Sequence, residues 1–547
     1  MENTLETDYL ILGGGTAGCV LAARLTEDPS VNVVVVEEGG APNDPRFKVP
    51  AGVSAVLGRD KFDWRYEIKP RESINHRKLD GAAGRVLGGG SSINGMVYIR
   101  GNAADYDSWE LQNGGTAVKP TGWAYRDLEP YFKRAENFVD RKAEHLGNNG
   151  PLTVSTTRDP NPVAEQLINA GYDMGYPSAD FNSGQLLGFG PAEGSVNKGS
   201  RASTYEAYLK PVIKRKNLTV LTKATVSRLV IQSGVVLGAE IEYRGRQLSV
   251  SAAQETLLCA GAIGSPAVLQ RSGIGAIDEL ANLGIQPKHE LSGVGKNLQE
   301  HVGCGISKYV NVTTINSQMN AASGLKHLLQ YLFKRTGMLA SPVVQTMAYI
   351  KTLPDLAQPD VQLALVPFAY IVQPESTNAL TAFTPKQNGV MLSGFIANPK
   401  SRGKVALNKH DISEKPIIDY DFFQQGEDLE TLVRSCKFIE SVFQQPAMAQ
   451  FVTGECSVQS PINSDKDWKD YIRAGAIPCY HFSGTCKMGV DKMAVVDPEL
   501  KIHGLSRLRV VDASIMPTVT SGNTYAPVVA IAEKAAEMIK ETRLAKQ

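Results

Sequence analysis

The first forty residues carry the most regular hydrophobic pattern in the chain. An apolar run, DYLIL, precedes a glycine-rich turn, and a second run, VNVVVVEE, follows it. Both runs are continuous rather than alternating, which is typical of central parallel strands covered on both faces. The stretch between them, from about Ala17 to Glu27, has the length and composition of a helix. The pattern therefore predicts a strand-turn-helix-strand unit at the N-terminus.

Other stretches predict a second layer of structure. Residues 217–269 alternate like short strands, with turns at Ser233-Gly234 and Arg244-Gly245, and end in a strand-glycine-helix transition. This region is expected to return to the N-terminal sheet. A helix is expected over 321–337, while DVQLALVPF and GVMLSGFIAN are typical of strands in another domain. No repeat or low-complexity linker separates these pieces, so we expect two domains that exchange segments.

The glycines of the first turn have the spacing of a dinucleotide-binding loop. Gly13, Gly15 and Gly18 form G-x-G-x-x-G. The first glycine permits the turn, the second lets the backbone approach a pyrophosphate, and the third lets the helix pack on the strand. Glu37 ends the second strand roughly twenty residues later, where a carboxylate can accept ribose hydroxyls. These residues predict dinucleotide binding and leave NAD and FAD open.

Composition limits the class of protein. The 547 residues have a net charge of +1, with 42% hydrophobic and 21% charged residues, as in a soluble globular enzyme. This balance gives no reason to expect nucleic acid or an anionic membrane as partner. The seven cysteines are scattered and odd in number, so they predict no disulfide framework. With no signal-like N-terminus and no long apolar run, we expect no membrane span and a cytoplasmic location.

The segment CYHFSGTCKMG, residues 479–489, holds three candidates for chemistry. Cys479, His481 and Cys486 raise the possibilities of a metal site, a thiol nucleophile or a general base. Their C-x-H-x₄-C spacing does not match the paired C-x₂-C of structural zinc sites, so we expect no metal and assign the cysteines to packing. A histidine with an ordinary pKa near 6.5 suits a base at neutral pH. Activity is then expected to rise with pH as His481 loses its proton.

Several motifs, in this order, resemble the glucose-methanol-choline (GMC) family of FAD-dependent oxidoreductases over nearly the whole chain. The resemblance implies an α/β fold with an α+β second domain. A Rossmann-like FAD-binding domain would interleave with a substrate domain whose antiparallel sheet faces the flavin. The expected FAD domain spans 1–155, 196–305 and 470–547, and the substrate domain spans 156–195 and 306–469. The motifs are the N-terminal fingerprint with Glu37, GRVLGGGSSINGMVYIRGN (84–102), GAIGSPAVLQRSGIG (261–275), GVGKNLQEH (293–301), NPKSRGKVAL (398–407), HFSGTCKMG and VVDASIMPTVTSGNTYAP.

The resemblance also implies roles for single residues. Ile93 stands where some relatives attach FAD covalently through histidine, so FAD is expected to be noncovalent. His481 and Asn523 match the catalytic pair, the histidine as base and the asparagine as an orienting amide. Tyr480 and Tyr525 are candidate pocket residues, whereas His301 and His503 are assigned structural roles. The residues implied to bind FAD are Gly13, Gly15, Gly18, Glu37, Gly88, Gly89, Ser91, Asn94, Val226 (through its backbone, at adenine), Asp512, Ala513, Asn523 and Thr524.

The function this implies is oxidation of an alcohol CH–OH group to a carbonyl by hydride transfer to flavin N5. Electrons would pass to O₂ or another acceptor, and we favour an oxidase over a dehydrogenase. The alternatives are an FAD-containing hydroxynitrile lyase without net redox, a noncatalytic flavoprotein, and an NAD-dependent dehydrogenase, which would leave the downstream motifs unexplained. The partner is a small alcohol, and the neutral net charge weighs against a cationic one such as choline.

Overall fold

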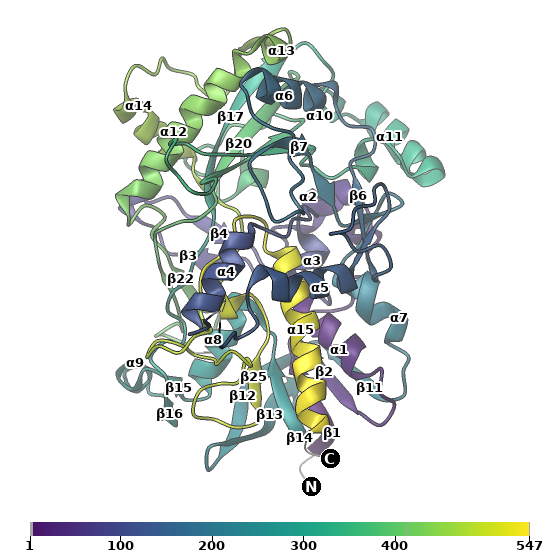
Figure 1. Ribbon diagram of the computed structural model, residues 1–547, viewed down its shortest axis with the longest axis vertical. Helices are drawn as coiled ribbons and strands as arrows, with labels where there is room; N and C mark the ends of the chain where they lie inside the picture. Colours follow the sequence, from purple (N-terminus) through teal and green to yellow (C-terminus); the bar gives the residue numbers. More distant parts are fainter. Residues whose placement is uncertain (1–3, 117, 412, 546–547) are drawn as a thin grey trace.

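Two seven-stranded sheets organise the part of the chain that the computed structural model describes, residues 4–116, 118–411 and 413–545. The first sheet lies in the lower half of Figure 1 and the second in the upper half. The chain passes several times between the two sheets, so each sheet is built from segments that are separate in sequence. The expected α/β class, with a second sheet-containing unit, is therefore confirmed, while the residue boundaries proposed for the two domains stay a prediction.

The first sheet has the strand order β11-β2-β1-β14-β13-β12, and β25 pairs with β14. The pairs β11/β2, β2/β1, β1/β14 and β14/β25 are parallel, whereas β12, β13 and β14 form an antiparallel meander. The strands are β1 (Thr4–Leu12), β2 (Val33–Glu37), β11 (Leu218–Thr222), β12 (Ala224–Gln232), β13 (Val235–Tyr243), β14 (Arg246–Leu258) and β25 (Leu508–Val510).

Local sequence signals produce this sheet as expected. Helix α1 (Thr16–Leu25) connects β1 to β2, and it packs against the C-terminal helix α15 (Tyr525–Leu544). The two predicted turns join β12 to β13 and β13 to β14. All four of their residues have positive φ, from 48° at Ser233 to 78° at Gly234. Two left-handed residues in a row are the requirement of a tight hairpin turn, so both turn predictions are confirmed.

The second sheet is antiparallel and has the order β23-β17-β20-β19-β18-β7, with β24 pairing to β17. Helices α6 (Pro162–Asp173) and α12 (Gly426–Phe443) pack against it. The expected helix near 321–337 is α11 (Ala321–Lys334), which stops where Arg335 turns left-handed. The strands are β7 (Gly188–Pro191), β17 (Val302–Val310), β18 (Thr346–Ile350), β19 (Val361–Val366), β20 (Gly389–Ile396), β23 (Val452–Glu455) and β24 (Ile477–Pro478).

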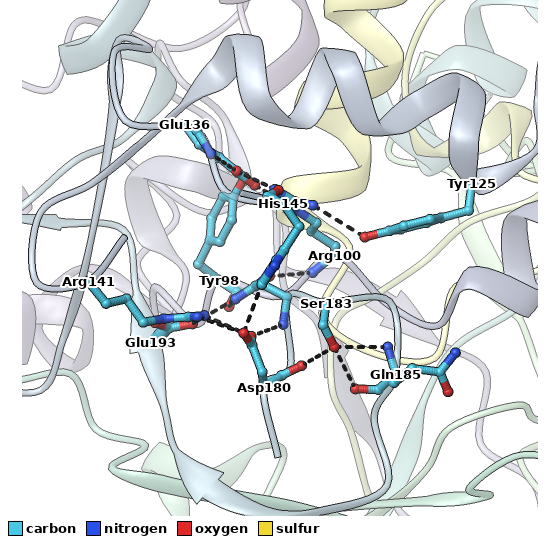
Figure 2. A network of polar contacts seen from close by, with 12 residues as sticks. Tyr98, Arg100, Tyr125, Glu136, Arg141, His145, Asp180, Ser183, Gln185 and Glu193 are labelled. Carbon is cyan, nitrogen blue, oxygen red and sulfur yellow. Dashed lines mark hydrogen bonds and ion pairs between the residues drawn. The ribbon is translucent and has the colours of Figure 1, made fainter. Parts of the chain in front are cut away.

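A buried polar network anchors the segment that follows the second glycine-rich loop (Figure 2). The Arg100 guanidinium donates to both carboxylate oxygens of Glu136, at 2.8 and 2.6 Å, and both side chains are fully buried. The Tyr98 hydroxyl also donates a hydrogen bond to Glu136, and nearby Arg141 forms an ion pair with Asp180. A buried charge pair of this kind is costly to break from one side only, so it fixes the path of the chain beside the loop.

Remaining helices and strands complete the framework around the two sheets. Among the described residues, no helix combines the length and the apolar character needed to cross a bilayer. The other elements of four or more residues are α2 (Val53–Val56), α3 (Gly90–Ile93), α4 (Ala103–Gln112), α5 (Tyr125–Ala135), β6 (Leu152–Thr156), η4 (Tyr205–Leu209), α8 (Gly261–Arg271), α9 (Ile277–Asn282), α10 (Ile315–Gln318), α13 (Pro446–Ala449) and α14 (Asp465–Gly475).

Candidate active site

A deep cavity of about 1090 Å³ is lined by residues of both large sheets. It brings together the predicted residues of the glycine-rich loops, the histidine segment and the C-terminal turn, which are far apart in sequence. Gly18 and Gly88 do not line the cavity and instead support its wall. The predicted residues that do line it are Gly13, Gly15, Glu37, Gly89, Ser91, Asn94, Val226, Tyr480, His481, Asp512, Ala513, Asn523, Thr524 and Tyr525, together with Ile93.

The N-terminal turn has the shape of a phosphate cradle. Gly13 has a φ of +110°, and a Cβ there would lie 2.4 Å from the carbonyl oxygen of Cys259. A Cβ on Gly18 would lie 2.0 Å from the Gly13 oxygen. Helix α1 begins after Gly15 without a side-chain cap, so its first N–H groups are left for a ligand. The roles predicted for the glycines match this geometry, and the cradle fits a dinucleotide pyrophosphate.

Glu37 closes the same end of the cavity. Its two carboxylate oxygens accept hydrogen bonds from the backbone N–H groups of Gly14 (2.9 Å) and Gly39 (2.8 Å). Burial raises the pKa of this carboxyl to about 7, against the lowering effect of those two bonds. Each oxygen keeps a lone pair for a further donor. The carboxylate is therefore oriented for the two ribose hydroxyls of an adenosine.

The second glycine-rich loop packs directly on the first. A Cβ on Gly89, whose φ is +52°, would lie 2.8 Å from Gly15 Cα. The Ser91 hydroxyl donates to the Gly88 carbonyl at 2.6 Å, and Asn94 Oδ1 accepts from Arg201 at 2.7 Å. These contacts hold the short helix α3 against the cavity. The loop thus offers its backbone to a flat ligand, as its composition predicts.

Asp512 joins the C-terminal turn to the start of α8. Its carboxylate accepts from the Gly261 N–H (2.9 Å), the Ser265 hydroxyl (2.6 Å) and the Ser514 N–H (2.8 Å). Burial raises the pKa of the carboxyl above its ordinary value. With three donors around it, Asp512 orders the cavity wall on which neighbouring Ala513 also lies.

His481 sits on an irregularity between two antiparallel segments. Gln299 and Ser483 exchange backbone hydrogen bonds at 3.0 and 3.1 Å, whereas the next backbone bond runs from the Cys479 N–H to the His301 carbonyl at 2.9 Å. The register has therefore shifted by two residues before His301, and it continues with Val302 paired to Pro478. Tyr480, His481 and Phe482 thus stand opposite Glu300 alone, and this excess forms a bulge of the kind found beside many active sites.

A buried carboxyl accepts hydrogen bonds from backbone N–H groups of the bulge. Glu300 Oε1 accepts from the backbone N–H groups of Cys479 and His481, each at 3.0 Å. Tyr480, between them, has a positive φ of 63°. Burial raises the pKa of the Glu300 carboxyl to about 8 despite these donors. Glu300 therefore positions the histidine through the backbone, without touching its ring.

The ring of His481 belongs to a directional hydrogen-bond chain. His301 Nε2 lies 3.1 Å from the Ala397 carbonyl, which can only accept, so this nitrogen carries the His301 proton. In a neutral ring the His301 Nδ1 must then accept, and its partner at 2.8 Å is the N–H at His481 Nδ1. The lone pair of His481 Nε2 consequently points at the amide nitrogen of Asn523, 3.1 Å away. Gln362 continues the chain by donating to Asn523 Oδ1 at 3.2 Å.

The electrostatics keep both imidazoles neutral. Burial lowers the pKa of His301 to about 4, and it lowers the pKa of His481 well below its ordinary value, with a further contribution from His301. His481 is 8% exposed, through the cavity. The arrangement can serve as a base, because His481 Nε2 is unprotonated and lies in a buried wall of the cavity.

The remaining candidates occupy defined places. Tyr480 and Tyr525 both line the cavity, and the Tyr525 hydroxyl donates to the Ala202 carbonyl at 3.2 Å. Burial raises the pKa of the Cys479 and Cys486 thiols well above the ordinary range, so they are poor nucleophiles at neutral pH. His503 bonds the Gly489 carbonyl at 3.1 Å, away from the cavity residues.

Sequence reasoning missed three contributors. His301, assigned a structural role above, contacts the catalytic candidate directly and fixes its tautomer. Glu300 precedes it, and Gln362 comes from the second sheet. The motif GVGKNLQEH contains Glu300 and His301, but nothing in it indicates that either residue contacts His481. Gln362 lies within an ordinary strand pattern and carries no signal of its own.

The fold and the site together define an FAD-dependent oxidoreductase. The profile of the GMC oxidoreductase family matches its N-terminal part at residues 7–303 and its C-terminal part at residues 399–532. The chain belongs to the GMC oxidoreductase family, and FAD is its cofactor. The resemblance stated from the sequence is confirmed.

Relatives and solved structures agree with this assignment. The chain is 35% identical to the oxygen-dependent choline dehydrogenase of Photobacterium profundum, over 97% of this chain and 92% of that one. The enzyme of the same name from Burkholderia ambifaria is 37% identical, over 98% and 94%. Pyridoxine 4-oxidase from Mesorbium loti matches with a TM-score of 0.86 and 32% identity, over 98% and 99%. A formate oxidase variant from Aspergillus oryzae RIB40 gives 0.91 and 26%, over the full length of both chains.

Proposed function

We propose that this protein oxidises the CH–OH group of an alcohol to a carbonyl, with His481 as the base. The observation that carries the proposal is the hydrogen-bond chain that leaves His481 Nε2 unprotonated and directed at the Asn523 amide. A substrate hydroxyl placed between Nε2 and the Asn523 amide can donate its proton to the histidine and accept from the amide. Asn523 has no basic group, so it orients the oxygen and stabilises its growing negative charge.

FAD, when bound, supplies the acceptor for the hydride that leaves the alcohol carbon. The residues that would hold it are the glycine cradle at Gly13 and Gly15, the carboxylate of Glu37 and the loop around Gly89. Ile93 lines the same cavity and cannot form a covalent bond to a flavin, which supports a noncovalent cofactor. Chemical extraction of the purified protein should release intact FAD.

The test compares single variants with the wild type under anaerobic mixing with an alcohol. We expect His481→Ala to retain FAD and to reduce it roughly 10²–10⁴-fold more slowly, because the proton acceptor is gone. Asn523→Ala should lose about 10²-fold while keeping the same pH profile. A His481→Ala protein that reduces its flavin at the wild-type rate would exclude His481 as the base. A flavin that stays oxidised with every alcohol would exclude the redox reaction itself.

For the substrate, we propose a neutral alcohol. The strands β18, β19 and β20 present Met347, Gln362, Ala364 and Phe395 to the cavity, and none of them carries a charge. A Cβ on Gly303 would lie 2.2 Å from the Phe395 ring, so this ring covers the neighbouring strand. Quaternary ammonium groups are held by carboxylates or by aromatic cages. These strands provide one ring and no carboxylate, and the other rings of the cavity, such as Trp64 and Tyr480, come from other segments. The uncharged strands support a neutral substrate rather than the choline in the names of the relatives.

Gln362 gives this part of the proposal a sharp test. We expect benzyl alcohol to have a higher kcat/KM than choline with the wild-type protein. Gln362→Glu, which adds a carboxylate of equal size, should raise the ratio of choline to benzyl alcohol by about tenfold. Gln362→Met, equally long and uncharged, is the control and should leave that ratio unchanged. Efficient choline oxidation by the wild type would refute the assignment.

For the electron acceptor, we propose O₂. Two structures with the same fold are named as oxidases, pyridoxine 4-oxidase and formate oxidase, and this supports the choice over a dedicated acceptor protein. The measurement is peroxide formed per alcohol consumed in air. A ratio near one is expected, and a reduced flavin that persists in air would require a different acceptor.

A further inference from the structure

Helix α11 presents its apolar side to solvent. Its large apolar residues occur at positions i, i+3, i+4, i+7 and i+8, which lie on one face of a helix. That face points away from the protein, and Figure 1 shows α11 standing out from the body at the upper right. The residues and their exposed fractions are Leu325 (59%), Leu328 (44%), Leu329 (45%), Leu332 (54%) and Phe333 (82%).

The opposite side of α11 holds the helix to the protein. Tyr331 is 3% exposed, and its hydroxyl lies 3.4 Å from the hydroxyl of Ser200 and 3.5 Å from the carbonyl of Lys48. The Arg335 guanidinium stacks over the Tyr331 ring with its carbon 4.6 Å from the centroid. This attachment fixes which face is outward. Five large apolar side chains in one exposed stripe are unusual on the surface of soluble proteins, and such stripes mark interaction sites.

The charges beside the stripe are of one sign. Lys326, Lys334 and Arg335 are on or directly after α11, and they form no ion pair within the part of the chain that the structure describes. The sequence contains no aspartate or glutamate from residue 302 to residue 354. The carboxylate of Asp159 comes near the end of the helix, where it accepts from the Gly337 N–H at 2.9 Å. The charged side chains on α11 and directly after it are therefore all basic.

We propose that α11 binds the surface of a membrane that contains anionic lipids. An apolar stripe flanked by lysine and arginine suits a helix lying in the lipid interface, with its leucines in the acyl region and its cations among the headgroups. Its 14 residues make it about 21 Å long, suited to lie on a bilayer and too short to cross one. A second copy of the chain fits less well, because pairing two such faces would bring the same uncompensated cations together.

The segment that follows α11 leads to the cavity. The short helix η5 (Met338–Ala340), which follows α11, packs on η2 (Pro50–Gly52). The residues just beyond these two helices, Val344 and Val53, line the cavity. The net charge of +1 gave no reason to expect an anionic membrane as partner. The excess of basic residues is confined to one segment, and acidic residues elsewhere in the chain balance its charge.

The test uses the full-length holoenzyme and sedimentation with vesicles. Wild-type protein should bind vesicles of phosphatidylglycerol mixed with phosphatidylcholine, and should bind pure phosphatidylcholine at least tenfold more weakly. The double variant Leu329→Ser, Phe333→Ser should weaken binding at least tenfold by removing apolar contact. The double variant Lys326→Gln, Lys334→Gln should weaken it roughly fivefold per cation removed, and added salt should do the same.

Leu111 provides the matched control. It is 71% exposed on α4, so Leu111→Ser removes an exposed leucine elsewhere and should leave vesicle binding unchanged. All these variants should keep wild-type flavin reduction in solution, which separates this proposal from the proposed function. Wild-type protein that fails to sediment with anionic vesicles would overturn the proposal. So would a lipid-free wild-type dimer that the Leu329→Ser, Phe333→Ser variant converts to a monomer, since a second copy would then occupy the stripe.

Discussion

Replacing His301 tests the directional hydrogen-bond chain without touching the base. In His301→Leu, the N–H at His481 Nδ1 loses the acceptor that lies 2.8 Å away in the native protein. In His301→Asn, the side-chain oxygen takes approximately the position of the lost Nδ1 and can accept the same proton. The two variants remove the same ring and differ in whether an acceptor remains. Any difference between them therefore reports on the tautomer of His481.

The size of the effect follows from the burial of this pair. A buried donor without an acceptor costs about 1–3 kcal/mol. That energy favours the other tautomer of His481, in which the proton sits on Nε2 and blocks the lone pair needed by the substrate. Because about 1.4 kcal/mol corresponds to a factor of ten in rate, flavin reduction should slow by roughly 5-fold to 150-fold in His301→Leu. In His301→Asn the loss should stay under about fivefold.

Anaerobic stopped-flow mixing with saturating alcohol measures the rate directly from the flavin absorbance. The FAD content of each variant is the control, because a lower rate with less cofactor would reflect folding. Equal losses in the leucine and asparagine variants would refute the tautomer argument and leave His301 a packing residue. A leucine variant with the wild-type rate would show that the His301 acceptor is dispensable.

Three further predictions follow from buried titratable groups. Burial holds the pKa of His481 well below its ordinary value, and the proposed base works only when unprotonated. Flavin reduction should therefore stay constant between about pH 8 and pH 6 and fall only in stronger acid. A rise in rate centred near pH 6.5 would contradict this and agree with the expectation from sequence. Glu300→Ala leaves the His481 backbone N–H without its acceptor and should lower kcat by about tenfold. Glu300→Gln keeps an acceptor and should stay near wild type in the same assay. Glu136→Ala strands the buried Arg100 guanidinium and should lower the free energy of unfolding by about 3–5 kcal/mol in denaturant titration; a loss under 1 kcal/mol would mean that water reaches the pair.

The parts of this protein that the sequence predicts are those fixed by local physics. The strand-turn-helix-strand unit follows from continuous apolar runs around glycines, and the clash at Gly13 shows why no other residue fits there. Both hairpin turns follow from residues that tolerate positive φ. The prediction of FAD-binding residues needed the order of motifs as well, because no local pattern places the loop around Gly89 against the first turn.

The pairing of His301 with His481 has a different origin. It joins residues 180 positions apart, and it arises because His481 lies in the bulge between the Gln299/Ser483 bridge and the backbone bond from Cys479 to His301. The sequence offers two histidines near two motifs but no indication that they are opposite one another. The same bulge places the His481 backbone N–H against the buried acceptor of Glu300 and leaves the His481 side chain on the cavity wall. Position, tautomer and pKa of the base thus all depend on how two distant segments pair, and a motif read alone carries only the identity of the residue.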